Sequence, residues 1–151
     1  MNNEILVDDC DAELLSSFRW LIKEFARGYP YAYRYIYVGK KRVTLLLHRV
    51  ILKAGKGQFV DHINGNGLDC RRSNIRICSH AENMRNRKTA KSNKIGVKGV
   101  YLSRGRYRAE IESKGVRYRI GTFDSIELAG KAYDEAAERL HQEFARTNQA
   151  I

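Results

Sequence analysis

The chain has 151 residues, of which 43% are hydrophobic and one is proline, so it has the composition of one or two small folded domains rather than of a disordered protein. No run of 18 apolar residues exists, which argues against a membrane-spanning helix, and the start MNNEILVDDCDAE is too acidic for a secretion signal. The formal net charge of +11 indicates a polyanionic partner, and nucleic acid is the first candidate.

The cysteines bear on the location of the protein. Cys10, Cys70 and Cys78 are too few and too scattered for a disulfide framework. A reducing compartment suits them, so we expect a cytoplasmic protein.

Residues 1 to about 57 hold several short apolar runs. The run ELLSSFRWLIKEF, residues 13–25, is predicted to be a helix. Tyrosine then occupies every odd position from Tyr31 to Tyr37, which predicts a strand with one aromatic face, and a turn at Gly39 leads into the next strand. These tyrosines either pack a small core or stack on bases, and core packing is the reading we favour.

Residues 60–88 read VDHINGNGLDCRRSNIRICSHAENMRNRK and predict a strand, a loop, a second strand and a helix. The first strand covers residues 60–63, and NGNG supplies turn residues that tolerate positive φ. Residues 74–78 alternate polar and apolar side chains, as a returning strand does. Ser79 and Glu82 form a capping box, so a helix should begin at His80 and run to about Arg87.

Four polar residues in this segment could support phosphodiester hydrolysis. Asp61 offers a hard oxygen to Mg²⁺, and His62 could take a proton from water. Asn74 could fix the imidazole of His62, and Asn83 lies one helical turn after His80. On their own these residues do not decide the case, because an Asp-His pair is more often structural. Asp61 and His62 are adjacent, so on a regular strand they should point to opposite faces.

The same residues resemble the HNH nucleases of the ββα-metal fold. The resemblance rests on Asp61-His62, Asn74 twelve residues after His62 and Asn83 nine further, with LHRVIL before them and ENMRNRK after them. The resemblance is greatest to the branch found in phage homing endonucleases. In that branch the third residue of the HNH motif is Asn rather than His. This resemblance implies that His62 is the general base, that Asp61 and Asn83 bind the metal, and that Asn74 orients the base. It also implies Mg²⁺, with Mn²⁺ as a substitute, because Asn in place of His leaves an oxygen donor.

Three neighbouring features have competing readings. Cys70, Cys78 and His80 lie near one another but lack the tight spacing of a zinc site, so no zinc is expected. His48, in the word LHR, is read as a structural histidine that supports the hairpin rather than as a second catalytic one. Arg76 is expected to leave the core on the face of Asn74, where it could hold a phosphate.

Residues 97–123, VKGVYLSRGRYRAEIESKGVRYRIGTF, predict three strands joined by hairpin turns at Arg104-Gly105 and Lys114-Gly115. One face of this sheet is apolar and the other carries arginines. The segment that follows, residues 125–148, has an apolar stripe rich in alanine at helical spacing. A helix with such a stripe would lie close against the apolar face and leave the arginine face free.

This third of the chain resembles the plant ethylene-response, or Apetala-two, DNA-binding domain. The words KGVY, RAEI, IGTF and AYDEAA carry the resemblance, followed by Phe144-Ala145 and Asn148. In that family the sheet reads DNA in the major groove. Carried over to this chain and extended along the arginine face, the resemblance gives the following DNA contacts: Lys98, Tyr101, Arg106, Arg108, Glu110, Arg117 and Arg119. Tyr101 and Arg119 depart from the plant pattern of Arg and Trp, so the target sequence is not transferred.

Together these features predict an α+β protein with three parts. Residues 1–88 contain N-terminal strands and a helix and then the nuclease module (core 45–88), residues 89–95 form a basic linker, and residues 96–151 form the Apetala-two-like domain, a three-stranded antiparallel sheet packed on one C-terminal helix. The expected function is that of a site-specific, Mg²⁺-dependent homing endonuclease. It would act as a monomer on double-stranded DNA, away from membranes, in the bacterial host cell if a phage encodes it.

Two other readings are kept. A DNA-binding regulator with an inactive nuclease module would share most of these features. An RNA-binding protein is less well supported, because the only aromatic platform is the tyrosine run 31–37.

Overall fold

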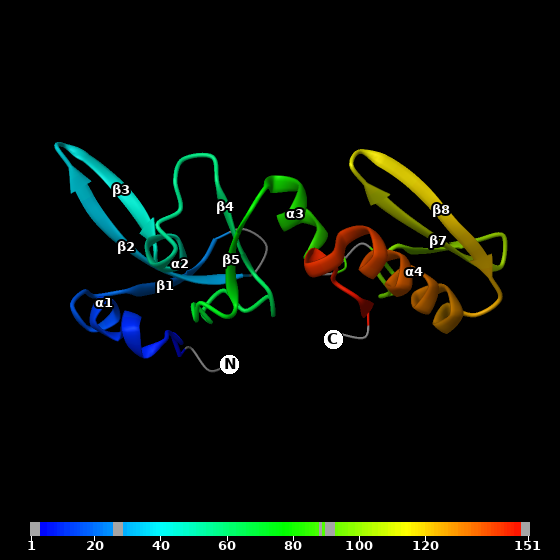
Figure 1. Ribbon diagram of the computed structural model, residues 1–151, viewed down its shortest axis with the longest axis horizontal. Helices are drawn as coiled ribbons and strands as arrows, with labels where there is room; N and C mark the ends of the chain where they lie inside the picture. Colours follow the sequence, from blue (N-terminus) through cyan, green and yellow to red (C-terminus); the bar gives the residue numbers. More distant parts are fainter. Residues whose placement is uncertain (1–3, 26–28, 88, 90–92, 149–151) are drawn as a thin grey trace. The chain divides into compact units, whose positions relative to one another are not determined.

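The computed structural model of the protein describes residues 4–25, 29–87, 89 and 93–148. The chain forms two compact units, Met1–His80 and Ala81–Ile151, each with its own hydrophobic core (Figure 1). The division predicted from the sequence remains a prediction, and residues 88 and 90–92, at and within the predicted linker, lie outside the described part. No helix in the described ranges is long and apolar enough to cross a membrane.

The first unit combines two small antiparallel sheets with short helices. Its order is η1 (Asp9–Asp11), α1 (Ala12–Ser16), β1 (Leu21–Glu24), β2 (Pro30–Val38), β3 (Lys41–Leu46), α2 (Leu47–Ile51), β4 (Phe59–His62) and β5 (Ile75–Cys78). Strands β1, β2 and β3 form one sheet in that order, and β4 pairs with β5 in the other. The core between them is built from Ala32, Leu47, Ile51, Leu68, Cys70 and Ile75.

The predicted helix over residues 13–25 is wrong beyond Ser16. The helix α1 ends there, and residues 21–24 form β1, in which Leu21 pairs with Tyr33. A local bond accompanies the early end: the Trp20 indole donates to the carbonyl of Leu14 at 3.2 Å, whereas the Glu13 carbonyl still accepts from the Ser17 amide. Side-chain donors of this kind satisfy carbonyls that a continuing helix would use.

The tyrosine strand is confirmed as β2, and its aromatic face changes character along its length. Tyr33 is buried, whereas Tyr35 is 38% exposed and Tyr37 is 72% exposed. The first half of the run therefore packs the core and the second half extends beyond it.

The second unit is a three-stranded antiparallel sheet packed on one long helix (Figure 1). It contains all but the first residue of α3 (His80–Arg85), then β6 (Val100–Ser103), β7 (Arg106–Ser113), β8 (Val116–Phe123), α4 (Ile126–His141) and η2 (Gln142–Phe144). The predicted hairpin turns are confirmed: Arg104 and Gly105 have φ of 53° and 77°, and Lys114 and Gly115 have φ of 53° and 76°. Such pairs of positive φ values are typical of the turns that join twisted strands.

The helix α4 lies close to the sheet because small residues line its inner face. Its buried Ala129, Ala136 and Ala137 pack against β6 and β7, and the Ser125 hydroxyl caps its start by accepting from the Leu128 amide. Gly99 makes room for Tyr133, since a Cβ at Gly99 would stand 2.1 Å from the Tyr133 ring. The prediction of an apolar face covered by an alanine-rich helix is confirmed.

Candidate active site and nucleic-acid interface

The hairpin of β4 and β5 places the first two candidate residues. Its register sets Asp61 opposite Arg76 and His62 opposite Ile75, and the Ile63 amide donates to the Asn74 carbonyl just beyond the strands. His62 therefore stands at the last position of β4, where the chain enters the loop of residues 63–74.

Asparagine side chains hold that loop together. The Asn64 carboxamide oxygen accepts from the Asn66 amide, and the Asn66 carboxamide oxygen accepts from the Leu68 amide. These bonds replace the backbone ladder with side-chain acceptors, as Asn does in turns. The loop is thus fixed although it has no regular structure.

Asp61 forms a largely buried ion pair with Arg76. The Arg76 guanidinium donates to Asp61 Oδ2 through Nη2 at 2.9 Å and through Nε at 3.2 Å, and the two side chains are 14% and 6% exposed for Arg and Asp respectively. Arg76 thus extends across the strand pair to Asp61. Whether it also holds a phosphate remains a prediction.

His62 lies among aromatic rings on the inner side of the hairpin. Its imidazole meets the His48 ring edge-to-face at 4.8 Å between centroids and the Tyr31 ring at 5.7 Å. Burial lowers the pKa of His62 to about 4, against the opposing influence of Asp61 and Asp69. The side chain is therefore a neutral imidazole near pH 7, which is the form that accepts a proton. Asp61 and His62 have different neighbours, in keeping with the alternation expected along a strand.

Asn74 acts on the loop instead of directly on the histidine. Its amide nitrogen donates to the Asp69 carbonyl at 2.8 Å and to Asn64 Oδ1 at 3.1 Å, and its oxygen accepts from the Asn64 amide. Both amide hydrogens are used in these bonds. The expected hydrogen bond to His62 is not among them, so any orienting effect of Asn74 passes through the loop that follows His62.

Asn83 lies on α3, in the second unit, whereas Asp61 and His62 belong to the first. Its role as a second metal ligand therefore remains a prediction. The expected start of this helix at His80 is confirmed, and the helix ends at Arg85 rather than at Arg87.

Three residues near His62 escaped the sequence analysis as parts of this site. His48 on α2 and Cys70 in the loop lie beside the imidazole of His62, and the carboxylate of Asp69 is buried nearby. Asp69 is held by Asn64 and Arg71, and the Arg71 guanidinium lowers its pKa. No spacing rule connects these positions, because three separate segments bring them together.

Comparison with known proteins identifies the family of the chain. A sequence profile described as HNH endonuclease matches residues 45–85, from β3 to the last residue of α3. The chain is 31% identical to an uncharacterized HNH endonuclease of Acanthamoeba polyphaga mimivirus over 137 residues, which cover 89% of this chain and 69% of that protein. The chain belongs to the HNH endonuclease family. It is also 37% identical over 93 residues to Protein 3.8 of Escherichia phage T7, covering 60% of this chain and 76% of that protein. No solved structure matches.

Membership in the HNH family gives the chain a coarse function, that of a nuclease, for which DNA is the substrate the family implies. HNH nucleases depend on a metal ion, and the family match runs through all four candidate residues: Asp61, His62, Asn74 and Asn83. The carboxylate of Asp61 is an oxygen donor of the kind that Mg²⁺ prefers.

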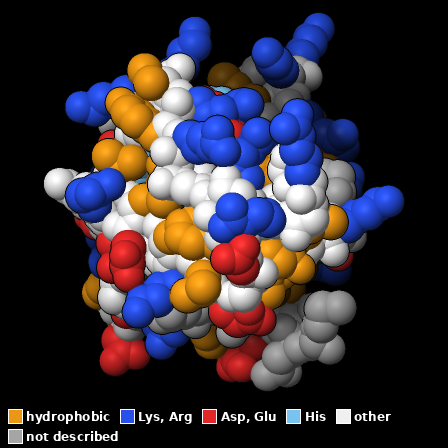
Figure 2. Space-filling view, turned by 90° about the vertical axis from the view of Figure 1, so that its right-hand side faces the viewer, with side chains coloured by type: hydrophobic (Ala, Val, Ile, Leu, Met, Phe, Trp, Pro, Cys, Tyr) orange, Lys and Arg blue, Asp and Glu red, His pale blue; other side chains and the backbone are white. Residues whose placement is uncertain are grey.

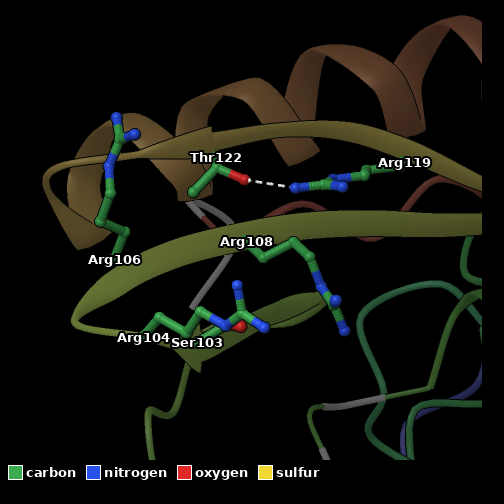
Figure 3. Close-up of a pocket in the computed structure, with 6 residues that line it drawn as sticks. All are labelled: Ser103, Arg104, Arg106, Arg108, Arg119 and Thr122. Atoms are coloured by element: carbon green, nitrogen blue, oxygen red, sulfur yellow. Dashed lines mark hydrogen bonds between the residues drawn. The ribbon is translucent and has the colours of Figure 1, made fainter.

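The second candidate surface is the sheet face opposite α4. Figure 3 shows Arg104, Arg108 and Arg119 over the strands, with Thr122 accepting a hydrogen bond from Arg119 at 3.0 Å. Together with Ser103 and Arg106 these residues line a shallow polar pocket. In the face of the molecule seen in Figure 2, Lys and Arg side chains gather in the upper half and Asp and Glu in the lower half.

A β-bulge that the sequence analysis missed shapes this surface. Ala109 pairs with Gly121 and Glu110 pairs with Arg119, so Ile120 is an extra residue in β8. The extra residue brings Thr122 to the same face as Arg119. Bulges redirect side chains in this way.

The predicted DNA contacts differ in how they are held. Tyr101, Arg117 and Arg119 are exposed, Arg106 pairs with the exposed Asp124, and Arg108 pairs with Glu110 at 3.0 Å. Lys98 is half-buried, its ammonium donates to the Arg85 carbonyl at the end of α3, and burial lowers its pKa to about 8. Lys98 therefore secures α3 to this unit as well as being a predicted contact.

Proposed function

We propose that the protein is a site-specific, Mg²⁺-dependent DNA endonuclease of the homing type. The observation that carries the proposal is the neutral imidazole of His62, which directly follows Asp61 at the end of β4, within the region that matches the HNH family. A base for water next to a hard oxygen ligand is the arrangement that phosphodiester hydrolysis requires.

Each residue has one task in this proposal. His62 takes the proton from the attacking water, and the loop fixed by Asn74 holds His62 in position. Asp61 and Asn83 bind Mg²⁺, or Mn²⁺ in its place. When bound, the cation would supply positive charge at the scissile phosphate.

The C-terminal unit would provide the DNA recognition. Its sheet, an Apetala-two-like domain in this proposal, presents Arg108 and Arg119 on a face that α4 leaves open, and arginine is the commonest reader of guanine. The basic segment 89–95 would follow the DNA backbone. The protein would act as a monomer, with the cut made as a nick or as a double-strand break.

The deciding experiment is cleavage of plasmid or phage DNA with Mg²⁺, with and without EDTA. We expect nicking that EDTA stops and that His62→Ala abolishes, while DNA binding in a gel-shift assay stays within about twofold. The control is His80→Ala, which removes an exposed histidine that contacts Phe59 and should leave cleavage unchanged. Loss of binding in step with cleavage would contradict the role of His62 as the base.

A DNA-binding regulator is the second candidate, and one observation favours it. Arg76 already neutralises the carboxylate of Asp61, an arrangement that a nuclease module without its cation could also retain. Sequence-specific binding with no nicking under Mg²⁺ or Mn²⁺ would select this alternative.

A further inference from the structure

Three metal-binding side chains from separate segments meet in the first unit. His48 comes from α2, His62 from the end of β4 and Cys70 from the loop before β5. Their ligand atoms all lie within 4.8 Å of one another, and the three residues are 4%, 6% and 0% exposed in that order.

His48 and Cys70 have no role in the proposed hydrolysis, and their side chains form few hydrogen bonds. His48 Nδ1 is buried and has no hydrogen-bond partner in the described part of the chain. The Cys70 thiol has the Gly67 carbonyl at 4.0 Å, the limit for a bond to sulfur. Buried polar atoms normally have partners, so the unpartnered His48 Nδ1 beside two further ligand atoms calls for an explanation.

The donor set identifies the ligand that would satisfy them. Two imidazoles and a thiol suit borderline or soft divalent ions such as Zn²⁺, Co²⁺ and Cd²⁺, whereas Mg²⁺ prefers oxygen. Bond lengths of about 2.0 Å to nitrogen and 2.3 Å to sulfur would set the ligand atoms about 3.3–3.6 Å apart. The ligand atoms would have to move together by roughly 1 Å, a distance that small side-chain rotations cover.

The surroundings of the three side chains are closely packed. The Tyr31 ring lies 5.2 Å from the His48 ring and 5.7 Å from the His62 ring, between centroids. Gly67 is packed so closely under this wall that a Cβ there would stand 2.3 Å from the Pro30 carbonyl and 2.8 Å from the Tyr31 ring. The cluster is therefore enclosed.

We infer that His48, His62 and Cys70 form a site for a thiophilic divalent ion of the Zn²⁺ class, and that its occupation inhibits DNA cleavage. Binding forms two metal–nitrogen bonds and one metal–sulfur bond, and the thiol proton of Cys70 leaves to the solvent. The inhibitory half rests on the proposed function, because the bound ion holds the lone pair with which His62 would accept a proton from water. This set differs from the Cys70, Cys78 and His80 set considered from spacing alone.

Metal binding is tested first, without any use of activity. Co²⁺ is titrated into the full-length protein, and the visible and near-ultraviolet spectra are recorded. We expect intense visible bands of four-coordinate Co²⁺ and a thiolate charge-transfer band at one equivalent. Cys70→Ser should remove the charge-transfer band, and His48→Gln should weaken Co²⁺ binding at least tenfold.

The other two cysteines provide matched controls. Cys10→Ser and Cys78→Ser should keep the wild-type spectrum. Trp20 fluorescence, which reports on the first unit, shows whether each variant is folded. A folded wild type without the charge-transfer band, or a band that survives in Cys70→Ser, overturns the site.

The inhibitory effect is tested by adding Zn²⁺ or Cd²⁺ to the Mg²⁺ cleavage assay. We expect wild type and Cys10→Ser to be inhibited, and Cys70→Ser to require at least a tenfold higher concentration. Equal inhibition of the wild type and both variants overturns the inhibitory role even when the Co²⁺ spectra support the site. An inactive wild type would overturn the proposed function and with it the inhibitory role, and the spectra would still decide the metal site.

Discussion

At the scale of single residues, the ion pair of Arg76 and Asp61 bears on metal binding. Arg76 supplies the positive charge that the carboxylate needs when it is taken from water. A divalent cation at Asp61 would supply the same charge. Arginine and the cation are therefore alternative partners of one carboxylate.

The first prediction follows from this competition. In EDTA, Arg76→Met should lower the free energy of unfolding of the first unit by about 2–3 kcal/mol, below the 3–5 kcal/mol of a fully buried pair because Arg76 keeps some contact with water. Mg²⁺ should restore part of this loss. Urea unfolding followed by Trp20 fluorescence measures both values.

The matched control is Arg42→Met, which removes a guanidinium that lies over the Tyr35 ring. Its effect should be the same in EDTA and in Mg²⁺. If Mg²⁺ restores nothing in Arg76→Met, Asp61 is not a ligand of the cation.

At the scale of elements, the arginine face of the β6–β8 sheet is expected to carry the specific DNA contacts. Arg108→Ala and Arg119→Ala should each weaken binding to the cognate site by about 1–3 kcal/mol if their side chains contact bases. Electrophoretic mobility shifts with cognate and scrambled duplexes measure the difference. Arg139→Ala, an exposed arginine on α4, is the control of equal charge.

The interpretation of these binding measurements depends on the change in preference for the cognate duplex as well as on the change in affinity. A base contact loses preference for the cognate duplex, whereas a phosphate contact weakens both duplexes equally. If Arg139→Ala weakens cognate binding as much as Arg119→Ala does, the sheet is not the reading face.

The C-terminal end of α4 gives a pH prediction. His141 is buried there, with Nε2 3.0 Å from the Glu112 carbonyl oxygen. Burial lowers the pKa of His141 below its usual 6.5, and the cations of Arg85 and Lys98 lower it further, against the bond to Glu112. Since the folded state resists protonation, the unfolded state takes up the proton first as the pH falls.

The second unit should therefore lose stability as the pH falls below about 6.5, until the folded-state pKa is passed. Thermal unfolding between pH 7.5 and 5 measures this, with Trp20 fluorescence used to subtract the first unit. His141→Gln, which keeps a donor for the carbonyl, should flatten this pH dependence. An unchanged pH dependence in that variant would assign the effect to other groups.

At the scale of the whole molecule, the net charge of +11 predicts how DNA binding responds to salt. Each phosphate neutralised by Lys or Arg releases counterions, so the binding constant should fall linearly with salt on logarithmic axes. Fluorescence anisotropy with a labelled non-specific duplex between about 50 and 200 mM salt should show a loss of at least tenfold, given several phosphate contacts. A binding constant independent of salt would exclude phosphate contacts as the main source of affinity.

The sequence predicts the second unit better than the first, for physical reasons. Strands β6–β8 alternate with period two between paired turn residues, so local rules define them. By contrast, β1 forms because Leu21 and Ile22 pair with β2, a tertiary contact that a local helical pattern does not reveal. The bulge at Ile120 is likewise not predicted from the sequence, because it depends on how β8 pairs with β7.

In the candidate site, too, the sequence identifies single residues but not the contacts that the fold creates between them. Asp61 and His62 are recognisable from their neighbours in the chain, and the family match covers them. The contact of His62 with His48 and Cys70 depends on three segments that fold together. The ion pair of Asp61 follows from the strand register, which the sequence alone leaves open.

The link between the N-terminal segment and the loop of residues 63–74 has a consequence for the order of folding. The Arg72 amide donates to Asp8 across 64 residues, the Arg72 guanidinium binds Asp11 across 61, and the Leu6 carbonyl accepts from the Cys70 amide. Contacts this distant in sequence cost more loop-closure entropy than local ones, which favours their closing after the local structure. During synthesis the segment that carries Asp8 and Asp11 leaves the ribosome before the loop and waits for it, and a nascent chain that stops short of Arg72 lacks these ties to the loop that follows His62.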